Sequence, residues 1–270
     1  MFLKRFLSSV IIIAVFLALI LFSYVPWVLN IGIALLSAAA VYEALMSTKF
    51  FEGRSLMVAG VVYALVMPFA AHFSLEIMLL ATFVFAMVIF VIQIVFFKTF
   101  NFKHTCVVLT VSVVISFFFS TAVFLRAKEP YGLYLLFYLF TSAWMTDVGA
   151  YTVGSLMGRH KLCPLVSPKK TVEGAVGGVL FAVLGIFLCT LFFRLITGVQ
   201  YNYFIVLPVA LGAAVTAEIG DLIASIIKRT FEIKDFGNVI PGHGGIFDRF
   251  DSIIFVAPYV YFIFNWLSPV

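Results

Sequence analysis

Charged residues are scarce in this chain of 270 residues. They make up 11% of it, whereas 64% is hydrophobic, and the mean hydropathy is +1.19. So little polar surface cannot cover a soluble globule, and a water-soluble fold is therefore excluded. The apolar runs also lack the period-two alternation of a transmembrane β-barrel. The composition predicts an all-α polytopic integral membrane protein.

Cysteine is equally rare, and several catalytic motifs are missing. The three cysteines, Cys106, Cys163 and Cys189, are scattered without CxxC spacing, which argues against a disulfide framework and a zinc site. The sequence contains no GxxxxGK(S/T) phosphate-binding loop, no GxSxG nucleophile motif and no HExxH zinc motif. These absences exclude P-loop nucleotide hydrolases, α/β-hydrolases and HExxH metalloproteases.

Long apolar runs, by contrast, are abundant. A helix needs about 20 apolar residues to cross about 30 Å of hydrocarbon, and nine segments qualify. The predicted spans cover residues 6–26, 29–48, 55–73, 75–97, 105–126, 132–157, 172–197, 203–227 and 249–268. The first follows a charged start like that of a signal peptide, but it is too long and no small-residue cleavage site follows it. We expect it to be retained.

Basic residues predict the orientation of these spans. With the N-terminus in the cytoplasm, only three of the 17 Lys and Arg residues fall outside, namely Arg126, Lys128 and Arg194. This bias is what the positive-inside rule expects. It places the C-terminus outside and the charged loops 158–171 and 228–248 in the cytoplasm. The net charge of +5 then reflects topology, and no nucleic-acid partner is expected.

Polar residues divide the chain into two parts. Residues 1–130, with five of the predicted spans, carry few of them, and Glu43 is the main exception. Residues 131–270, with the other four spans, hold most of the polar side chains that chemistry would require. We therefore predict an N-terminal hydrophobic helical scaffold and a C-terminal catalytic membrane domain.

The eighth predicted span contains carboxylates, which are costly in lipid and often mark functional sites. Steps of three, four and three residues put Glu218, Asp221, Ser225 and Lys228 on one helical face. Asp221 would lie about 10 Å below the cytoplasmic end of this helix, in a polar cavity. Interhelical hydrogen bonding or an intramembrane ion pair is the alternative interpretation.

A second pair of carboxylates opens the ninth predicted span. Asp248 and Asp251 are three residues apart and point the same way from one helix start, with Arg249 between them. Such a pair suits Mg²⁺, which takes one or two carboxylates and completes its shell with water and phosphate. Helix capping by acids is the alternative. We favour a metal site that also includes Asp221.

A glycine-rich loop precedes Asp248 and reads Pro241-Gly242-His243-Gly244-Gly245. Its glycines let backbone N–H groups approach an anion near a helix N-terminus. A plain hairpin is the alternative for the loop, and an ordinary hydrogen-bonding role is the alternative for His243.

The other cytoplasmic loop ends in a lysine pair, Lys169 and Lys170, just before a predicted helix. The pair either binds phosphates as point charges or contributes only to the positive-inside bias. Asp147, inside the sixth span, is either a polar anchor or part of the same site.

The stretch from Ser225 to Asp251 resembles the signature of the phosphatidate cytidylyltransferase (CDP-diacylglycerol synthase) family. Fourteen residues occupy its fixed positions without a gap. They are Ser225, Lys228, Arg229, Lys234, Asp235, Gly237, Ile240, Pro241, His243, Gly244, Gly245, Asp248, Arg249 and Asp251. The stretches 147–151 and 167–174 also resemble the family's upstream blocks, so the resemblance covers about residues 141–252.

The resemblance implies an enzyme that transfers CMP from CTP to phosphatidic acid, giving CDP-diacylglycerol and pyrophosphate. It implies Mg²⁺, with Mn²⁺ as a substitute, bound by Asp221, Asp248 and Asp251, and a second cation that is divalent or monovalent. The expected location is a bacterial inner membrane, with the active site facing the cytoplasm. Membrane lipids and a second copy of the chain, in a homodimer, are further candidate partners.

The resemblance also implies roles for individual residues. The implied catalytic residues are Asp221, Asp248, Asp251, Lys169 and His243. Those implied to bind substrate phosphates are Lys169, Lys170, Ser225, Lys228, Arg229, Lys234, Gly242, His243, Gly244, Gly245 and Arg249. Those implied to orient these groups are Asp147, Tyr151, Ser167, Thr171, Glu173, Glu218 and Asp235.

Two other functions fit parts of the same pattern. Another CTP-dependent lipid enzyme, a polyprenol kinase or a CDP-archaeol-type synthase, would share the nucleotide site and differ in its acceptor. An ion-coupled transporter would use the intramembrane carboxylates but would need neither the glycine loop nor the many cytoplasmic cations. The fate of labelled CTP distinguishes these functions.

Overall fold

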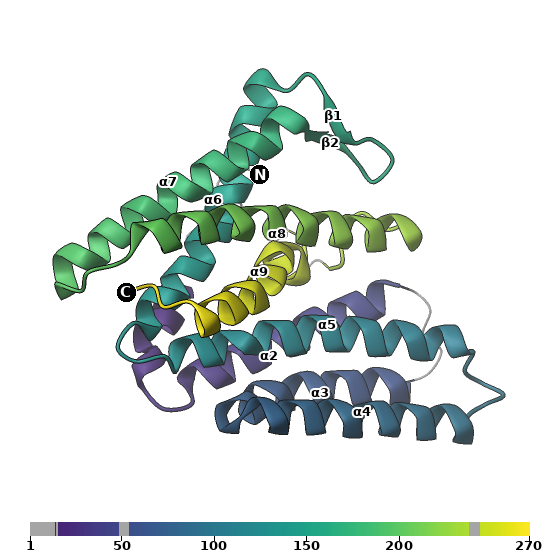
Figure 1. Ribbon diagram of the computed structural model, residues 1–270. Helices are drawn as coiled ribbons and strands as arrows, with labels where there is room; N and C mark the ends of the chain where they lie inside the picture. The colour runs from purple at the N-terminus through teal and green to yellow at the C-terminus, as the bar shows by residue number, and fades with distance from the viewer. Residues whose placement is uncertain (1–13, 15, 49–53, 238–243) are drawn as a thin grey trace. The chain divides into compact units, whose positions relative to one another are not determined.

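The computed structural model describes residues 14, 16–48, 54–237 and 244–270, which are helical apart from one hairpin and the connecting turns (Figure 1). The chain forms two compact units. Unit 1 comprises Met1–Phe124 and Thr230–Phe250, and unit 2 comprises Leu125–Arg229 and Asp251–Val270. The signature stretch that begins at Ser225 is therefore divided between the two units.

Unit 1 is built from four long helices that follow a short 3₁₀ turn, η1 (Phe22–Tyr24). The helices are α2 (Val28–Ser47), α3 (Arg54–Phe73), α4 (Leu75–Val95) and α5 (Phe102–Arg126). Helix α2 packs against α3, and α3 packs against α4. A single residue, Ser74, joins α3 to α4, and its hydroxyl caps α4 by accepting a hydrogen bond from the Ile77 N–H at 3.3 Å. The helices α3 and α4 thus correspond to the predicted spans 55–73 and 75–97.

Unit 2 contains the other long helices and the hairpin. Its elements are α6 (Gly132–Met157), β1 (Lys161–Cys163), β2 (Ser167–Thr171), α7 (Val172–Thr197), α8 (Tyr203–Thr230) and α9 (Phe247–Trp266), of which α8 and α9 each extend into unit 1 at one end. The strands are antiparallel and pair Lys161 with Thr171. The predicted loop 158–171 therefore contains a short hairpin, which lies at the end of the α6–α7 pair in Figure 1.

Helices α6 and α7 approach each other closely. A β-carbon added at Gly149 would lie 2.6 Å from the carbonyl oxygen of Gly177, so no larger residue fits at this crossing without displacing backbone. Small residues permit such close contact between membrane helices. The crossing brings together the two helices that flank the hairpin, which leaves α6 and leads into α7.

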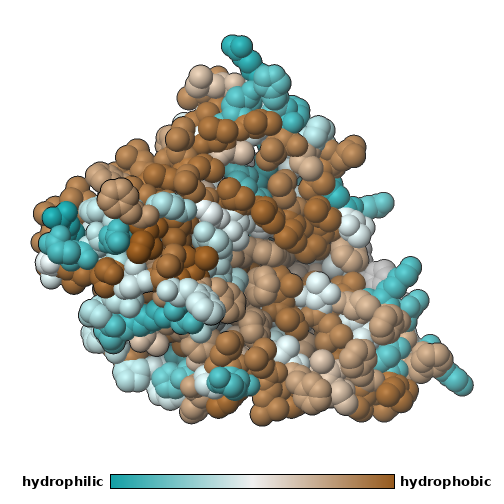
Figure 2. Space-filling view, in the orientation of Figure 1, coloured by the Kyte–Doolittle hydropathy of each residue, from teal (hydrophilic) through white to brown (hydrophobic). Residues whose placement is uncertain are grey.

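Six helices are long and apolar enough to cross a membrane among the residues that the structure describes. They are α2, α3, α4, α5, α7 and α8. Figure 2 agrees, because brown apolar side chains cover most of the face in view and the hydrophilic ones form small groups. The predicted all-α integral membrane class is confirmed. The count of nine spans and the orientation of the termini remain predictions.

Candidate active site

Lys170 is the centre of a cluster of charged side chains in unit 2. Its ammonium nitrogen lies 2.6 Å from Oε2 of Glu218 and 2.6 Å from Oδ2 of Asp221. The three side chains are 19%, 11% and 30% exposed, respectively. Because one ammonium group reaches both acids, Glu218 and Asp221 lie on one face of α8, as their spacing of three residues requires.

The surroundings of Lys170 keep it charged. Burial lowers its pKa, but the carboxylates of Asp221 and Glu218 raise it by more, so the pKa lies above the usual lysine value. Lys170 is held at the end of β2, next to Thr171 at the start of α7. A cation is thus fixed against two acids in an apolar helical unit.

Two further carboxylates belong to this cluster. Asp147 of α6 and Asp251 of α9 both lie close enough to Asp221 for their charges to interact with it. The positive charge of Lys228 also interacts with Asp251. Asp251 is buried, with 6% of its surface exposed. Ser252 connects the two acids, because its hydroxyl donates to Oδ1 of Asp147 at 3.2 Å and its N–H donates to Oδ1 of Asp251 at 2.8 Å. Three helices and one strand therefore supply the cluster.

The donor set of the cluster suits a hard cation. Within the described part of unit 2, the cluster holds four carboxylates, Asp147, Glu218, Asp221 and Asp251, beside the cations Lys170 and Lys228. A surplus of carboxylate oxygen of this kind is what Mg²⁺ prefers. Even so, no group of three or more His, Cys, Asp or Glu side chains is arranged to hold a metal ion within the described ranges. The metal site of Asp221, Asp248 and Asp251 stays a prediction.

Asp248 belongs to unit 1, where it organises the end of the glycine-rich loop. Its Oδ2 accepts hydrogen bonds from the Phe236 N–H at 2.9 Å and from the Gly245 N–H at 3.1 Å. Gly244, immediately before the second of these amides, has a φ of +83°, a left-handed conformation that favours glycine. One carboxylate thereby joins the two sides of the loop. Gly242 and His243 lie outside the described residues.

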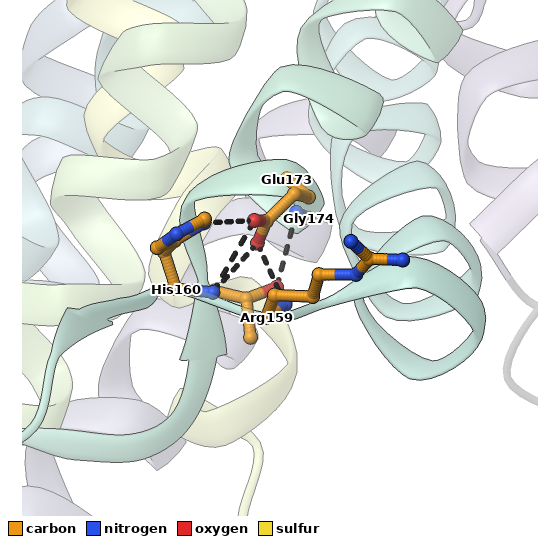
Figure 3. Close-up of polar contacts among 5 residues, drawn as sticks. Arg159, His160, Glu173 and Gly174 are labelled. Atoms are coloured by element: carbon orange, nitrogen blue, oxygen red, sulfur yellow. Dashed lines mark hydrogen bonds and ion pairs between the residues drawn. The ribbon is translucent and has the colours of Figure 1, made fainter.

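Glu173 and Thr171 stabilise the hairpin (Figure 3). Glu173 Oε2 accepts hydrogen bonds from the backbone N–H groups of Arg159 at 3.0 Å and His160 at 3.1 Å, and Oε1 contacts Nδ1 of His160. Figure 3 shows the side chain of Arg159 extending away from this carboxylate. Thr171 caps α7 by accepting from the Gly174 N–H at 3.1 Å. Both residues fix the strand that carries Lys170.

The other predicted site residues are spread over both units. Lys169 is exposed on β2, Ser167 begins that strand and Tyr151, 79% exposed, lies on α6. Arg229 of α8 donates from Nε to the carbonyl oxygen of Val166 at 3.1 Å. Ser225 is partly exposed on α8. In unit 1, Lys234 and Asp235 are exposed in the loop after α8, and Arg249 is exposed on the first turn of α9.

Two residues with contacts to the site were not assigned from the sequence. Ser252 gave no signal, because a serine next to an aspartate is common. Glu43 did give one, since it is an acid in an otherwise apolar span. In the structure it is 4% exposed and its Oε2 accepts a hydrogen bond from the Phe247 N–H at 3.2 Å.

A cavity of about 920 Å³ lies beside the hairpin, between α6 and α7. Most of its lining is apolar, and Val153, Leu156 and Val176 are typical. Arg159, His160 and Glu173 form its polar part. The cavity thus combines an apolar wall with a polar end in which Arg159 lies near the Glu173 carboxylate, an arrangement that suits an amphipathic molecule.

Comparison with known proteins agrees with this chemistry. The Cytidylyltransferase family matches residues 3–267. A phosphatidate cytidylyltransferase of Bacillus subtilis (strain 168) is 40% identical over 171 residues, which are 63% of this chain and 62% of that protein. A phosphatidate cytidylyltransferase of Staphylococcus aureus (strain COL) is 47% identical over 127 residues, which are 47% of each chain. A third, of Staphylococcus haemolyticus, is 43% identical over 132 residues, which are 49% of each chain.

Each of these matches spans less than two thirds of the relative's own length. The family match, by contrast, extends over nearly the whole sequence and includes the residues of both units. The chain belongs to the cytidylyltransferase family.

Proposed function

We propose that the protein is a phosphatidate cytidylyltransferase of a bacterial inner membrane. One observation carries the proposal: a buried cluster in which Lys170 is fixed between Glu218 and Asp221, with Asp147 and Asp251 beside them. Charged groups of both signs in an apolar helical unit suit a substrate that is a lipid at one end and a phosphate at the other. The names of the relatives support this choice of substrates.

In the proposed reaction a phosphate oxygen of phosphatidic acid attacks the α-phosphorus of CTP. A new P–O–P bond joins the lipid phosphate to CMP, the bond between the α- and β-phosphates breaks, and pyrophosphate leaves with the electron pair. Such phosphoryl chemistry requires little covalent participation by the protein. Positioning and charge neutralisation account for most of the catalysis.

The residues of this chain fit those two tasks. Lys170, held by Glu218 and Asp221, supplies a fixed positive charge, and the exposed Lys169 beside it is free to follow the substrate. Lys228, Arg229 and Arg249 would neutralise triphosphate or lipid phosphate oxygens. The backbone amides of the loop that ends at Gly245 would donate to phosphate, and His243 and Gly242 are assigned to the same loop.

Asp221, Asp248 and Asp251 are the residues that would hold Mg²⁺ or Mn²⁺, with a second, divalent or monovalent, cation beside it. A bound divalent cation would supply additional neutralisation of the triphosphate charge. Asp147, held by Ser252, would keep Asp251 and its neighbours in position. Thr171 and Glu173 would do the same for Lys170 by fixing the hairpin.

The proposed topology has nine spans, with the N-terminus and both basic loops in the cytoplasm. CTP is a cytoplasmic substrate, so the hairpin and the signature loop would be on its side of the membrane. Phosphatidic acid would come from the inner leaflet. The cavity between α6 and α7 suits its passage, because acyl chains match the apolar lining and the lipid phosphate matches Arg159.

The test is an assay of the detergent-solubilised protein with phosphatidic acid, Mg²⁺ and CTP labelled at one defined phosphate. Label at the α-phosphorus should appear in a CDP-lipid with release of pyrophosphate, and a chelator should stop the reaction until Mg²⁺ is restored. Transfer of the γ-phosphate would identify a lipid kinase instead. Ion flux in proteoliposomes without CTP would identify a transporter, and an ether-linked acceptor used in preference would identify a CDP-archaeol-type synthase.

A further inference from the structure

Glu43 is a buried acid within residues 1–130, the predicted N-terminal scaffold. No other acid of this segment is assigned to the proposed chemistry. It lies on α2 in unit 1 and is 4% exposed. Its neighbours along the helix, Ala40, Val41, Ala44 and Leu45, are apolar and fully or almost fully buried. A carboxylate in such a position is costly unless hydrogen-bond donors or a positive charge stabilise it. The question is therefore what Glu43 does in unit 1.

The backbone at the end of the signature loop donates a hydrogen bond to the carboxylate. Oε2 of Glu43 accepts a hydrogen bond from the Phe247 N–H at 3.2 Å, although the two residues are 204 positions apart. A β-carbon added at Gly237 would lie 2.6 Å from Oε1, and one added at Gly245 would lie 2.5 Å from Oε2. A side chain at either position would therefore displace the Glu43 carboxylate or the loop backbone.

The two sides of the loop are also joined from within. Asp248 accepts from the Phe236 N–H on one side and from the Gly245 N–H on the other. Glu43 contacts the same two sides, at Gly237 and at Gly245, from α2. The loop backbone is therefore held between one carboxylate on its own helix and one on a helix of the N-terminal segment.

The geometry points to Glu43 as a positioning residue for the two described ends of the signature loop, residues 236–237 and 244–248, and we propose that this is how the N-terminal segment contributes to catalysis. The inference rests on the proposed function, in which this loop donates amides to the phosphates of CTP. Glu43 would touch neither substrate. It would hold the backbone that presents the phosphate-binding amides. It would do so by accepting from the Phe247 N–H and by filling the space beside Gly237 and Gly245.

A second feature of Glu43 supports a role beyond simple packing. Its Oε1 is buried and has no hydrogen-bond partner among the residues that the structure describes. An apolar side chain would fill the same space without the cost of a buried acceptor. We therefore expect the carboxylate to be needed because it positions the loop backbone.

The experiment is a double-substitution cycle in the full-length protein. Gly245→Ala inserts a methyl group against Oε2 of Glu43, and Glu43→Asp withdraws the carboxylate by one methylene group. We expect Gly245→Ala to raise the KM for CTP about tenfold, with the KM for phosphatidic acid unchanged. We expect the double variant to recover most of that loss and also to melt at a higher temperature than Gly245→Ala alone.

Two single variants complete the design. Glu43→Met, which keeps about the same length but cannot accept the hydrogen bond from the Phe247 N–H, should raise the KM for CTP. Its kcat should stay within about threefold of the wild type, because a positioning residue takes no part in the chemical step. Ser37→Ala, on the same helix and equally buried, is the control and should leave both KM values unchanged.

Some outcomes would overturn the inference. The first is a double variant whose KM effect equals the product of the two single effects and whose melting-temperature change equals their sum. The second is a rise in the KM for phosphatidic acid equal to that for CTP in Gly245→Ala. The third is a loss of kcat alone in Glu43→Met. The melting temperatures need no substrate, and the wild-type assay is run in parallel. A wild type without CTP-dependent activity would therefore disprove the proposed function, whereas additive melting temperatures would disprove the contact between Glu43 and the loop.

Discussion

Lys170 and Asp221 form an ion pair with 2.6 Å between the ammonium nitrogen and Oδ2, and the same ammonium lies 2.6 Å from Glu218. The lysine comes from β2 and both acids from α8, so the contact connects the hairpin to a long helix within unit 2. All three side chains are mostly buried. Removing the lysine would leave two acids facing each other in apolar surroundings.

Replacement of Lys170 by methionine should therefore lower both stability and activity. Breaking a buried ion pair by removing one partner costs about 3 kcal/mol or more, which a melting curve in detergent would detect. Turnover should fall at least about 100-fold, as for other lost charge-stabilising groups. Lys169→Met is the matched variant, because Lys169 is exposed and should lower activity without lowering the melting temperature. Equal melting temperatures for Lys170→Met and the wild type would contradict the prediction.

Asp248→Asn should abolish turnover while the protein still folds. Asparagine keeps an oxygen that can accept from the N–H groups of Phe236 and Gly245, so the loop contacts survive. It loses the negative charge that a metal requires, and we expect activity to fall by about 10³-fold or more. Glu232→Gln removes an exposed acid from the same segment and should remain active. Near-normal activity of Asp248→Asn would remove Asp248 from the metal site.

Two helix caps separate stability from function. Thr171→Ala and Ser74→Ala each remove a hydroxyl that accepts from a backbone N–H in the first turn of a helix. Each should cost about 1 kcal/mol. Only Thr171→Ala should also reduce activity, because Thr171 adjoins Lys170 on β2, and Thr171→Ser should restore it. Equal activities for the two alanine variants would show that the cap does not help to place Lys170.

The orientation of the hairpin can be tested by cysteine labelling in a variant without the three native cysteines. Leu165, 93% exposed, lies in the hairpin, and Ala127 is exposed between α5 and α6. With the hairpin in the cytoplasm, Leu165→Cys should react with an impermeant maleimide only after the membrane is opened. Ala127→Cys should react in intact cells. The reverse pattern would invert the predicted topology.

The helices follow from the sequence more fully than the loops do. Apolar run length predicts the bounds of α3 and α4 closely, at residues 55–73 and 75–97. The hairpin was not predicted, because its strands are three and five residues long and show no alternation. Its hydrogen bonds depend on Glu173 reaching back to Arg159 and His160, a contact that local patterns do not reveal.

The candidate site shows the same difference between contacts within a helix, which the sequence predicts, and contacts between distant segments, which it does not. Helical spacing on α8 predicts the shared face of Glu218 and Asp221, and the structure brings them together at Lys170. The grouping of Asp248 with α2 could not be predicted, because it depends on contacts between segments far apart in the chain. Composition indicates that Glu43 is unusual but does not indicate which backbone it faces.

The distance of 204 positions between Glu43 and Phe247 has a consequence for synthesis. A ribosome that adds about 5–20 residues per second needs roughly 10–40 s to pass from one to the other. During that interval α2 exists, but the amide that its carboxylate accepts does not. Unit 1 is thus begun first and completed only when Thr230–Phe250 has been made. A chain released before that point would carry an acid in an apolar helix with no loop to receive it.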